Sequence, residues 1–314
     1  MSKPILGIIG GGQLGSMLAI AANKLEIKTV IFCDDIDAPA QNFSNDFVHG
    51  EYNDKNKINE FLSKVDVVTY EFENIPYETL NEINKIKPVL PKPSVNRIIQ
   101  HRLAEKDFIN NLNIRTTRYV SIEKKSEMDS VEDLLPGILK TTTLGYDGKG
   151  QHPINSLENL DSIDVDYSKG YILEKLVKLK KEISIIITRF DIQKYEIYEP
   201  IENEHEDQIL RNSKIPAEIS DKILEQSKLW ATTIAEELKY VGTLCVEFFI
   251  DRNDNLYVNE IAPRVHNSGH LTINAYNVSQ FENHVRAVCK LEQIPLKKIS
   301  NAMMTNIIGD QITN

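Results

Sequence analysis

The sequence has few of the features that would tie it to an oxidising compartment or to a membrane. Its three cysteines, Cys33, Cys245 and Cys289, are odd in number and widely spaced. They fit buried thiols in a reducing compartment better than a disulfide set or a zinc site. No apolar run approaches the length of a membrane span, and the N-terminus lacks a signal-peptide pattern. We therefore expect a cytoplasmic protein that does not bind membranes.

Basic residues are also outnumbered. The 314 residues include 36 Lys and Arg against 46 Asp and Glu, which gives a net charge of −10. This balance argues against broad binding to nucleic acids or anionic lipids, although it leaves room for a local basic pocket that holds a small phosphate ligand. With 41% hydrophobic and 26% charged residues, the composition is typical of a soluble globular protein with two or three domains.

Strands and helices alternate in the first part of the chain. Apolar runs at 5–9, 30–33 and 65–70 are typical of short strands, and helical patterns follow the first and precede the third. This alternation predicts a parallel sheet, hence an α/β fold. The proline-rich segment 87–94 is expected to close this unit near residue 95.

The rest of the chain has a different pattern. A helix is expected from about 94 to 111, followed by short strands at 138–140 and 172–174. Strands are then predicted at 182–190, 193–199 and 206–211, and a helix at 216–239 whose spacing makes Trp230 a core residue. These patterns predict a mixed α+β body that carries a mobile lid.

The most informative tract predicts a hairpin. Apolar runs at 246–251 and 256–261 flank a polar turn at 252–255. Glu247 interrupts the first run, and Asn259 and Glu260 end the second. Because antiparallel neighbours can bring two carboxylates side by side, this pattern suits Mg²⁺, which prefers oxygen ligands and shares its remaining positions with phosphate and water.

Arg264 and His266 follow the hairpin within one short loop. A metal site beside a fixed cation is typical of phosphate transfer. Each residue alone has a plainer interpretation, since a Glu in a strand usually faces water and an Arg-x-His loop is usually solvated. Five converging polar groups nevertheless favour function, because a buried Glu without a partner would be costly.

Two glycine-rich segments suggest phosphate binding. Gly10, Gly12 and Gly15 match G-x-G-x-x-G between a strand and a helix, and Asp34 lies about twenty residues on. This motif is weak evidence for NAD and moderate evidence for a phosphate ligand, and it also fits an ordinary tight turn. The segment 145–150 has three glycines in six residues, so its backbone could wrap phosphates and close over them, although it is not a P-loop.

Other polar segments give weaker signals. Lys106 and Lys140 could each pair with a nucleotide phosphate, although a lone lysine is more often exposed. Residues 174–177 could present backbone groups to an adenine edge. Residues 70–74 follow a strand of the first unit, at the sheet edge where α/β folds bind ligands, and a solvated strand end is an equal alternative there.

These segments, in this order, resemble the ATP-grasp superfamily and, more narrowly, the 5-(carboxyamino)imidazole ribonucleotide synthases of purine synthesis. The matching tracts are residues 10–15, 69–74, 145–151 and 259–270, and the last two are highly specific. The resemblance implies an ATP-grasp fold with an N-terminal Rossmann-like (pre-ATP-grasp) domain at 1–95. Linker helices and a small lid domain would follow at 96–178, and a large ATP-grasp domain with a short C-terminal segment at 179–314.

The resemblance also implies a set of site residues. ATP would contact Arg102, Lys106, Lys140, Gly145, Tyr146, Asp147, Gly148, Lys149, Gly150, Gln151, Glu174, Lys175, Leu176, Val177, Glu182, His205, Asn259 and Glu260. Mg²⁺, or Mn²⁺, would be held by Glu247, Asn259 and Glu260. The substrate, aminoimidazole ribonucleotide, would contact Gly12, Gln13, Leu14, Glu73, Tyr146 and Asp147. Arg264 and His266 would orient bicarbonate, Asp147 would accept the proton of the amine, and a homodimer is expected.

Two departures from the family pattern stand out. The family usually has an Arg shortly after the lysine at 140, where this sequence has Thr141, Thr142 and Thr143. Family members also continue past the strand at 303–308 into a short basic segment that helps hold the ribonucleotide. Because this sequence ends Gly309 to Asn314 without a cation, we expect the 314-residue chain to bind ATP and Mg²⁺ but to bind the ribonucleotide weakly.

Three alternative functions remain open from the sequence. The first keeps the superfamily and changes the acceptor, as in a formate-using glycinamide ribonucleotide formyltransferase or a biotin-type carboxylase, although the tract 264–270 favours the carboxyamino synthase. The second is an NAD-dependent oxidoreductase based on the first glycine motif, which leaves the paired carboxylates and the second glycine loop unexplained. The third is a non-catalytic nucleotide-binding module, which would bind nucleotide without turnover.

Overall fold

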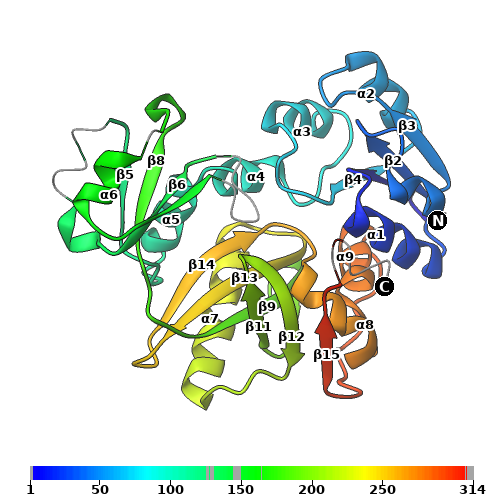
Figure 1. Cartoon of the computed structure of the whole chain (residues 1–314). Helices are drawn as coiled ribbons and strands as arrows, with labels where there is room; N and C mark the ends of the chain where they lie inside the picture. The colour runs from blue at the N-terminus through cyan, green and yellow to red at the C-terminus, as the bar shows by residue number, and fades with distance from the viewer. Residues whose placement is uncertain are drawn as a thin grey trace.

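The computed structural model describes residues 3–124, 127, 131–143, 150–163, 165–307 and 309. The strands of the described residues form three sheets, which Figure 1 shows as three separate bodies. None of the helices within these ranges combines the length and the apolar character that a membrane crossing requires.

The N-terminal sheet is parallel, with the strand order β3-β2-β1-β4. Its strands β1, β2 and β4 are completely buried, because helices cover both faces as in other βαβ folds. One face packs on α1, and the other packs on α2 and α3. In chain order, the elements are β1 (Leu6–Ile9), α1 (Gln13–Lys24), β2 (Thr29–Cys33), η1 (Pro39–Phe43), β3 (Asp46–His49), α2 (Lys55–Leu62), β4 (Val67–Tyr70) and α3 (Tyr77–Asn84).

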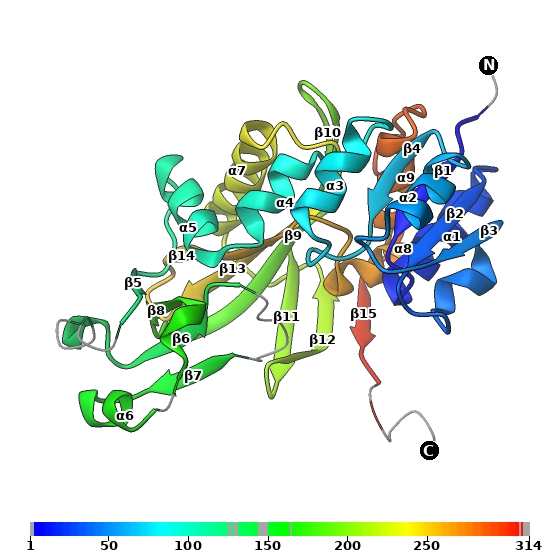
Figure 2. The same ribbon diagram turned by 90° about the horizontal axis from the view of Figure 1, so that it is seen from above.

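Two helices, α4 (Pro93–Ile99) and α5 (Arg102–Asn111), lead to a small antiparallel sheet with the order β5-β8-β6-β7. This sheet has a small hydrophobic core of its own. It stands apart from the N-terminal sheet in Figures 1 and 2. Its elements are β5 (Tyr119–Ile122), η3 (Glu132–Leu134), β6 (Gly137–Thr141), β7 (Gln151–Ile154), α6 (Leu157–Ser162), η4 (Tyr167–Lys169) and β8 (Tyr171–Lys175).

The third sheet is antiparallel and runs β14-β13-β9-β11-β12-β15, with β10 paired to β9. Helix α7 covers one face. The elements are β9 (Leu179–Asp191), β10 (Lys194–Ile197), β11 (Ile201–Glu206), β12 (Ile209–Ile215), α7 (Asp221–Glu237), β13 (Gly242–Asp251), β14 (Leu256–Ala262), η5 (Asn267–Leu271), α8 (Thr272–Ala275), α9 (Gln280–Val288) and β15 (Ala302–Thr305).

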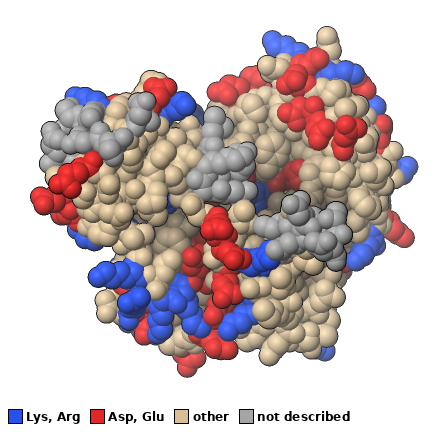
Figure 3. Space-filling model, in the orientation of Figure 1, with Lys and Arg blue, Asp and Glu red and all other residues tan. Residues whose placement is uncertain are grey.

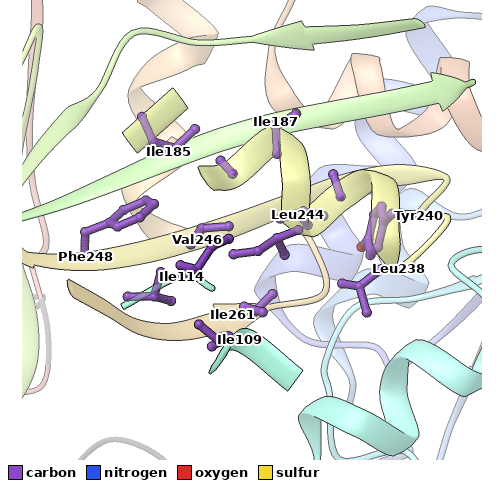
Figure 4. Packing of buried hydrophobic residues seen from close by; sticks show 14 of the residues in the cluster. Ile109, Ile114, Ile185, Ile187, Leu238, Tyr240, Leu244, Val246, Phe248 and Ile261 are labelled. Atoms are coloured by element: carbon purple, nitrogen blue, oxygen red, sulfur yellow. The ribbon is translucent and has the colours of Figure 1, made fainter. Parts of the chain in front are cut away.

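The two faces of this third sheet have different surroundings. Side chains of alternate residues on β9, β13 and β14 pack with α4, α5 and α7 in the hydrophobic cluster of Figure 4. Trp230 is partly buried and packs against this cluster, stacking on Phe248 with ring centroids 6.5 Å apart, so it packs on the core as expected but lies at its edge. Because side chains alternate along a strand, Glu182 and Glu247 project from the opposite face.

Two elements differ from the sequence-based expectation. The helix expected at 94–111 is two helices, because the chain turns at His101, whose ring nitrogen accepts the backbone N–H of Ala104 and caps α5. The strand expected at 206–211 is the end of β11 and the start of β12. Asp207 and Gln208 both have positive φ and form the turn between the two strands. The sequence has no glycine here, and glycine is the usual signal for such a turn.

Candidate active site

The paired carboxylates lie where the hairpin places them. Strands β13 and β14 are antiparallel, and Glu247 lies directly opposite Glu260 in their register. The register shifts between Glu247 and Phe248, so Asn259 is an extra residue in β14. This bulge lets Val258 and Ile261 both face the core while Asn259 and Glu260 stand between them.

A cavity of about 850 Å³ lies beside these carboxylates, and it is lined by residues of both antiparallel sheets and by Gln13, Glu73 and Asn74 of the N-terminal part, which lie at the start of α1 and after β4. Figure 3 shows the hollow between the three bodies, with acidic and basic side chains around it. Many of the residues expected in the site line this one cavity. They are Gln13, Glu73, Arg102, Lys140, Gln151, Glu182, His205, Glu247, Asn259, Glu260, Arg264 and His266.

Arg264 and Glu73 form a two-point contact at the cavity wall. Arg264 Nε donates to Glu73 Oε2 at 2.5 Å, and Nη2 donates to Oε1 at 3.4 Å. Burial acts to raise the pKa of Glu73, but the Arg264 guanidinium outweighs it and holds that pKa below its usual value. The contact joins the strand end of the first sheet to the loop after β14, so the expected ribonucleotide and bicarbonate sites adjoin.

His266 is held in one orientation. Its Nδ1 accepts the backbone N–H of Ser268 at 3.3 Å and lies 2.9 Å from Ser268 Oγ, while Nε2 lies 3.1 Å from Glu247 Oε1. Burial and then the charge of Arg264 lower the pKa of His266 well below its usual value. A neutral ring with its proton on Nε2 therefore satisfies both contacts, with Nε2–H donating to the Glu247 carboxylate.

Two further charge pairs flank the carboxylates. Arg102 Nη1 donates to Glu260 Oε2 at 3.2 Å. His205 Nδ1 lies 2.8 Å from Glu182 Oε2. Burial acts to lower the pKa of His205, but the Glu182 carboxylate outweighs it and raises that pKa. The cavity wall thus combines anions and cations, as a site for a metal-bound polyphosphate requires.

Other expected site residues lie away from the cavity lining. Lys106 is fully buried behind it, and Glu174 is buried between two lysines. The backbone N–H groups of Lys175 and Leu176 donate to the carbonyls of Arg118 and Pro136, so those two groups are not available to an adenine. Gly12, Leu14, Gly150 and Val177 also lie outside the lining. Gly145, Tyr146, Asp147, Gly148 and Lys149 lie outside the described residues.

A carboxylate of the chain itself accepts hydrogen bonds from the backbone of the first glycine motif. The Glu71 carboxylate accepts the backbone N–H of Gly12 and, at 2.5 Å, that of Gly15, at the start of α1. A Cβ added at Gly10 would lie 2.5 Å from Glu71 Cγ. The motif's glycines therefore make room for a carboxylate of this chain. These two N–H groups therefore already have an acceptor within the chain, and the expectation that the turn binds a ligand phosphate stays a prediction for the rest of the motif.

Glu105 is a cavity residue that the sequence interpretation missed. It is 3% exposed, and its Oε1 accepts the backbone N–H of Ile261 at 2.6 Å. Burial and then the Glu260 carboxylate raise the pKa of Glu105 to about 8. The sequence did contain a signal for its place in the cavity: Glu105 follows Arg102 by three residues, and residues three apart share a helix face.

The residues present fit a divalent cation with oxygen ligands. Burial, followed by the nearby Glu260 carboxylate, raises the pKa of Glu247, and a bound cation would relieve this repulsion. Cys245, Glu247 and His266 also bring ligand atoms within 4.8 Å of one another. The Cys245 thiol lies in a hydrophobic cluster, and burial raises its pKa well above the usual value. Carboxylate and amide oxygens therefore remain the better donor set for Mg²⁺.

This fold and this site define the class of ATP-grasp enzymes. The ATP-grasp domain model matches residues 107–281, and the ribonucleotide synthetase preATP-grasp domain model matches residues 2–100. The two matches meet at α5, which separates the parallel sheet from the two antiparallel sheets.

The chain belongs to the N5-carboxyaminoimidazole ribonucleotide synthase family. It is 38% identical to the synthase of Brucella melitensis, a match covering 98% of this chain and 86% of that one. The crystal structure of the Staphylococcus aureus synthetase complexed with ADP aligns with a TM-score of 0.91 and 34% identity, covering 99% of this chain and 84% of that one. The Aspergillus clavatus synthase in complex with ADP and 5-aminoimidazole ribonucleotide aligns with a TM-score of 0.88 and 28% identity, covering 98% and 83%.

Proposed function

We propose that this chain is an ATP-dependent carbon–nitrogen ligase that joins bicarbonate to the amine of 5-aminoimidazole ribonucleotide. The product is 5-(carboxyamino)imidazole ribonucleotide, an intermediate of purine synthesis. The observation that carries the proposal is the opposed pair Glu247 and Glu260 in a cavity that Arg264 and His266 also line. One cavity then offers a metal site to a nucleotide and a fixed cation to a small oxyanion.

The reaction has two steps. A bicarbonate oxygen attacks the γ-phosphorus of ATP, the bond to ADP breaks, and carboxyphosphate forms. The amine nitrogen then attacks the carboxyl carbon of carboxyphosphate, or the CO₂ released from it; inorganic phosphate leaves, and the nitrogen loses a proton. We propose Asp147 as the acceptor of that proton, and this residue lies outside the described part of the chain.

The cavity residues have distinct proposed roles in these steps. Lys140 and Arg102 face the nucleotide phosphates, and Mg²⁺ held by Glu247, Asn259 and Glu260 would supply neutralising charge there. Arg264, fixed by its two-point contact with Glu73, orients bicarbonate. Neutral His266, whose Nε2–H donates to Glu247, carries no charge that would compete with the Arg264 guanidinium for bicarbonate. Closure of residues 145–150 would exclude water from carboxyphosphate.

The domain division also belongs to the proposal. We propose a Rossmann-like domain at 1–95, linker helices and a lid at 96–178, and the large ATP-grasp domain at 179–314. The support is that the parallel sheet ends at Tyr70, the small sheet ends at Lys175, and the third sheet begins at Leu179.

The proposal is tested by coupled measurement of ADP release. We expect turnover that requires bicarbonate and 5-aminoimidazole ribonucleotide together, with ¹³C from labelled bicarbonate appearing in the carboxyamino product. Formate in place of bicarbonate, and glycinamide ribonucleotide in place of the aminoimidazole substrate, serve as controls. Turnover would contradict the proposal if it occurred when formate replaces bicarbonate, or when glycinamide ribonucleotide replaces 5-aminoimidazole ribonucleotide. Nucleotide binding without ribonucleotide-dependent turnover would contradict it as well.

A further inference from the structure

We propose that Lys106 is a positioning residue whose buried ammonium group holds Glu174, so that the charge of Lys140 remains available to an anionic ligand. The inference rests on the nucleotide site proposed above. Lys106 is 2% exposed and lies behind the cavity lining, whereas Lys140 is part of that lining. The resemblance to the family would make Lys106 a ligand of ATP, and the contacts of its side chain give it a different role.

The ammonium group of Lys106 already has a full set of partners. Nζ donates to Thr116 Oγ1 at 3.0 Å, to Thr117 Oγ1 at 3.1 Å and to the carbonyl oxygen of Asn259 at 3.3 Å. It also lies 3.2 Å from Glu174 Oε2. Since an ammonium group has three protons, these four acceptors leave it no donor for a phosphate.

The partners of Lys106 come from three separate parts of the fold. Thr116 and Thr117 follow α5, Glu174 lies on β8 of the small sheet, and Asn259 lies on β14 beside Glu260. One buried ammonium group therefore fixes the small sheet to the strand that carries the proposed metal ligands. Without this group, the position of Lys140 relative to the carboxylates of Glu247 and Glu260 would be less firmly fixed.

The charges of the cluster explain why Glu174 needs two lysines. Lys140 Nζ lies 3.2 Å from Glu174 Oε1, and Lys106 faces the other oxygen. The trio of Lys106, Lys140 and Glu174 therefore carries one excess positive charge, and Lys140 presents it at the cavity. Without Lys106, the pair of Glu174 and Lys140 would be neutral. The charge of Arg102, which also acts on Glu174, is the same with and without Lys106. A unit charge in such a buried setting has a large effect on a nearby phosphate.

The test compares two variants by calorimetric binding of ADP in the presence of Mg²⁺. In Lys106→Met we expect ADP binding to weaken by at least about tenfold, because the cavity loses its excess charge. In the double variant Lys106→Met/Glu174→Gln, Lys140 no longer faces a carboxylate at position 174, and we expect ADP affinity to return to within about threefold of the parent. Lys64→Met is the matched control, since Lys64 also bridges two carboxylates, Asp46 and Glu60, but on the surface away from the cavity.

The two roles of Lys106 predict different results for the double variant. If Lys106 contacted the phosphates directly, the double variant would still lack that contact and would recover only part of the affinity, so ADP binding that stays more than about threefold weaker than in the parent would overturn the proposal. Normal ADP binding by Lys106→Met would overturn it as well. If the single variant does not fold, a folded double variant still decides the question by its ADP affinity. None of these measurements requires carboxylation, so failure of the proposed reaction would be seen separately.

Discussion

At the scale of single residues, the carboxylate pair of the hairpin makes the most direct prediction. Glu260→Gln keeps the shape of the side chain but removes one charge from the proposed metal site. We expect ADP formation to fall by at least about a hundredfold, since groups that stabilise developing charge contribute several kcal/mol to the transition state. The measurement is steady-state ADP release, with the thermal unfolding temperature as the check on folding.

The control for this change is Glu218→Gln. The Glu218 side chain is 78% exposed and contacts Lys214 at the surface, so the variant should keep parental turnover. Near-normal turnover of a folded Glu260→Gln would remove this residue from the metal site.

Arg264 separates binding from chemistry. Arg264→Ala should leave ADP affinity within about threefold of the parent while reducing kcat, because an oriented cation matters most where charge develops. Arg264→Lys should recover little activity, since lysine lacks the planar fork that contacts both oxygens of Glu73. The measurements are ADP calorimetry and kcat. An equal loss in ADP affinity and in turnover would assign Arg264 to the nucleotide site instead.

Single residues also show which positions could be predicted from the sequence and which could not. Arg264 and His266 could be predicted to lie near the carboxylates, because only a short loop separates them from Glu260. The buried position of Lys106 could not, since its partners Glu174 and Asn259 are distant in sequence and lie on strands of two different sheets. A lysine on a helix has the same local pattern whether it faces a nucleotide or a buried carboxylate.

At the scale of elements, the hairpin was the most predictable part of the fold. Alternating apolar residues set which face of β13 and β14 is buried, and the polar turn sets a register that brings Glu247 next to the Asn259–Glu260 pair. Without the bulge, that register would place Asn259 opposite Glu247, so the exact pairing with Glu260 did not follow from the local pattern. The bulge at Asn259 gave no local signal. The two-helix break at His101 and the turn at Asp207 and Gln208 were also missed, because tertiary packing selects these bends among residues that tolerate several conformations.

The start of α1 gives a prediction for an element. Glu71→Gln removes the anion that accepts N–H groups from Gly12 and Gly15. We expect a loss of roughly 1–2 kcal/mol in the free energy of unfolding, since charge-assisted bonds at a helix start are stronger than neutral ones. The measurement is urea denaturation, and ADP affinity should not change.

An exposed acidic residue in the first turn of another helix provides the comparison for Glu71. Glu78 occupies that place in α3, and Glu78→Gln should change the stability by only a few tenths of a kcal/mol. Unchanged stability in Glu71→Gln, or a parallel loss of ADP affinity, would mean that the glycine turn does something other than bind Glu71.

At the scale of the whole molecule, a C-terminal helix packs against the N-terminal part of the chain. Helix α9 packs on α1 of the N-terminal sheet, so residues near 285 complete a core that starts at Leu6. Figure 1 shows α9 beside α1 at the opposite ends of the colour range. The parallel sheet of the first part could be predicted from the alternation of strands and helices, but this return could not, because amphipathic helices do not specify which sheet they cover.

His284 on α9 makes this connection sensitive to pH. Its Nδ1 accepts the backbone N–H of Thr243 at 3.0 Å, and Nε2 lies 2.8 Å from Thr69 Oγ1. Burial lowers the pKa of His284 to about 4. Between about pH 4 and the unfolded value near 6.5, the unfolded chain therefore binds more protons, and stability falls as the pH is lowered through this window.

The expected size of this effect is about 2 kcal/mol of unfolding free energy between pH 7 and pH 5. Urea denaturation at the two pH values measures it, and His284→Gln, which stays neutral, isolates the contribution of this ring from that of other titrating groups. The variant should be less stable at pH 7 but should lose less stability on going to pH 5. An identical pH difference in both proteins would contradict a buried neutral His284.

The most direct test of the proposed reaction follows one oxygen atom. If a bicarbonate oxygen attacks the γ-phosphorus, the bond that forms stays with phosphorus when carboxyphosphate breaks down. Turnover with ¹⁸O-labelled bicarbonate, ATP and 5-aminoimidazole ribonucleotide, measured before the label exchanges with water, should therefore place one ¹⁸O atom in each phosphate released, as seen by ³¹P NMR. Phosphate without ¹⁸O, formed at the rate of ribonucleotide-dependent turnover, would contradict the account.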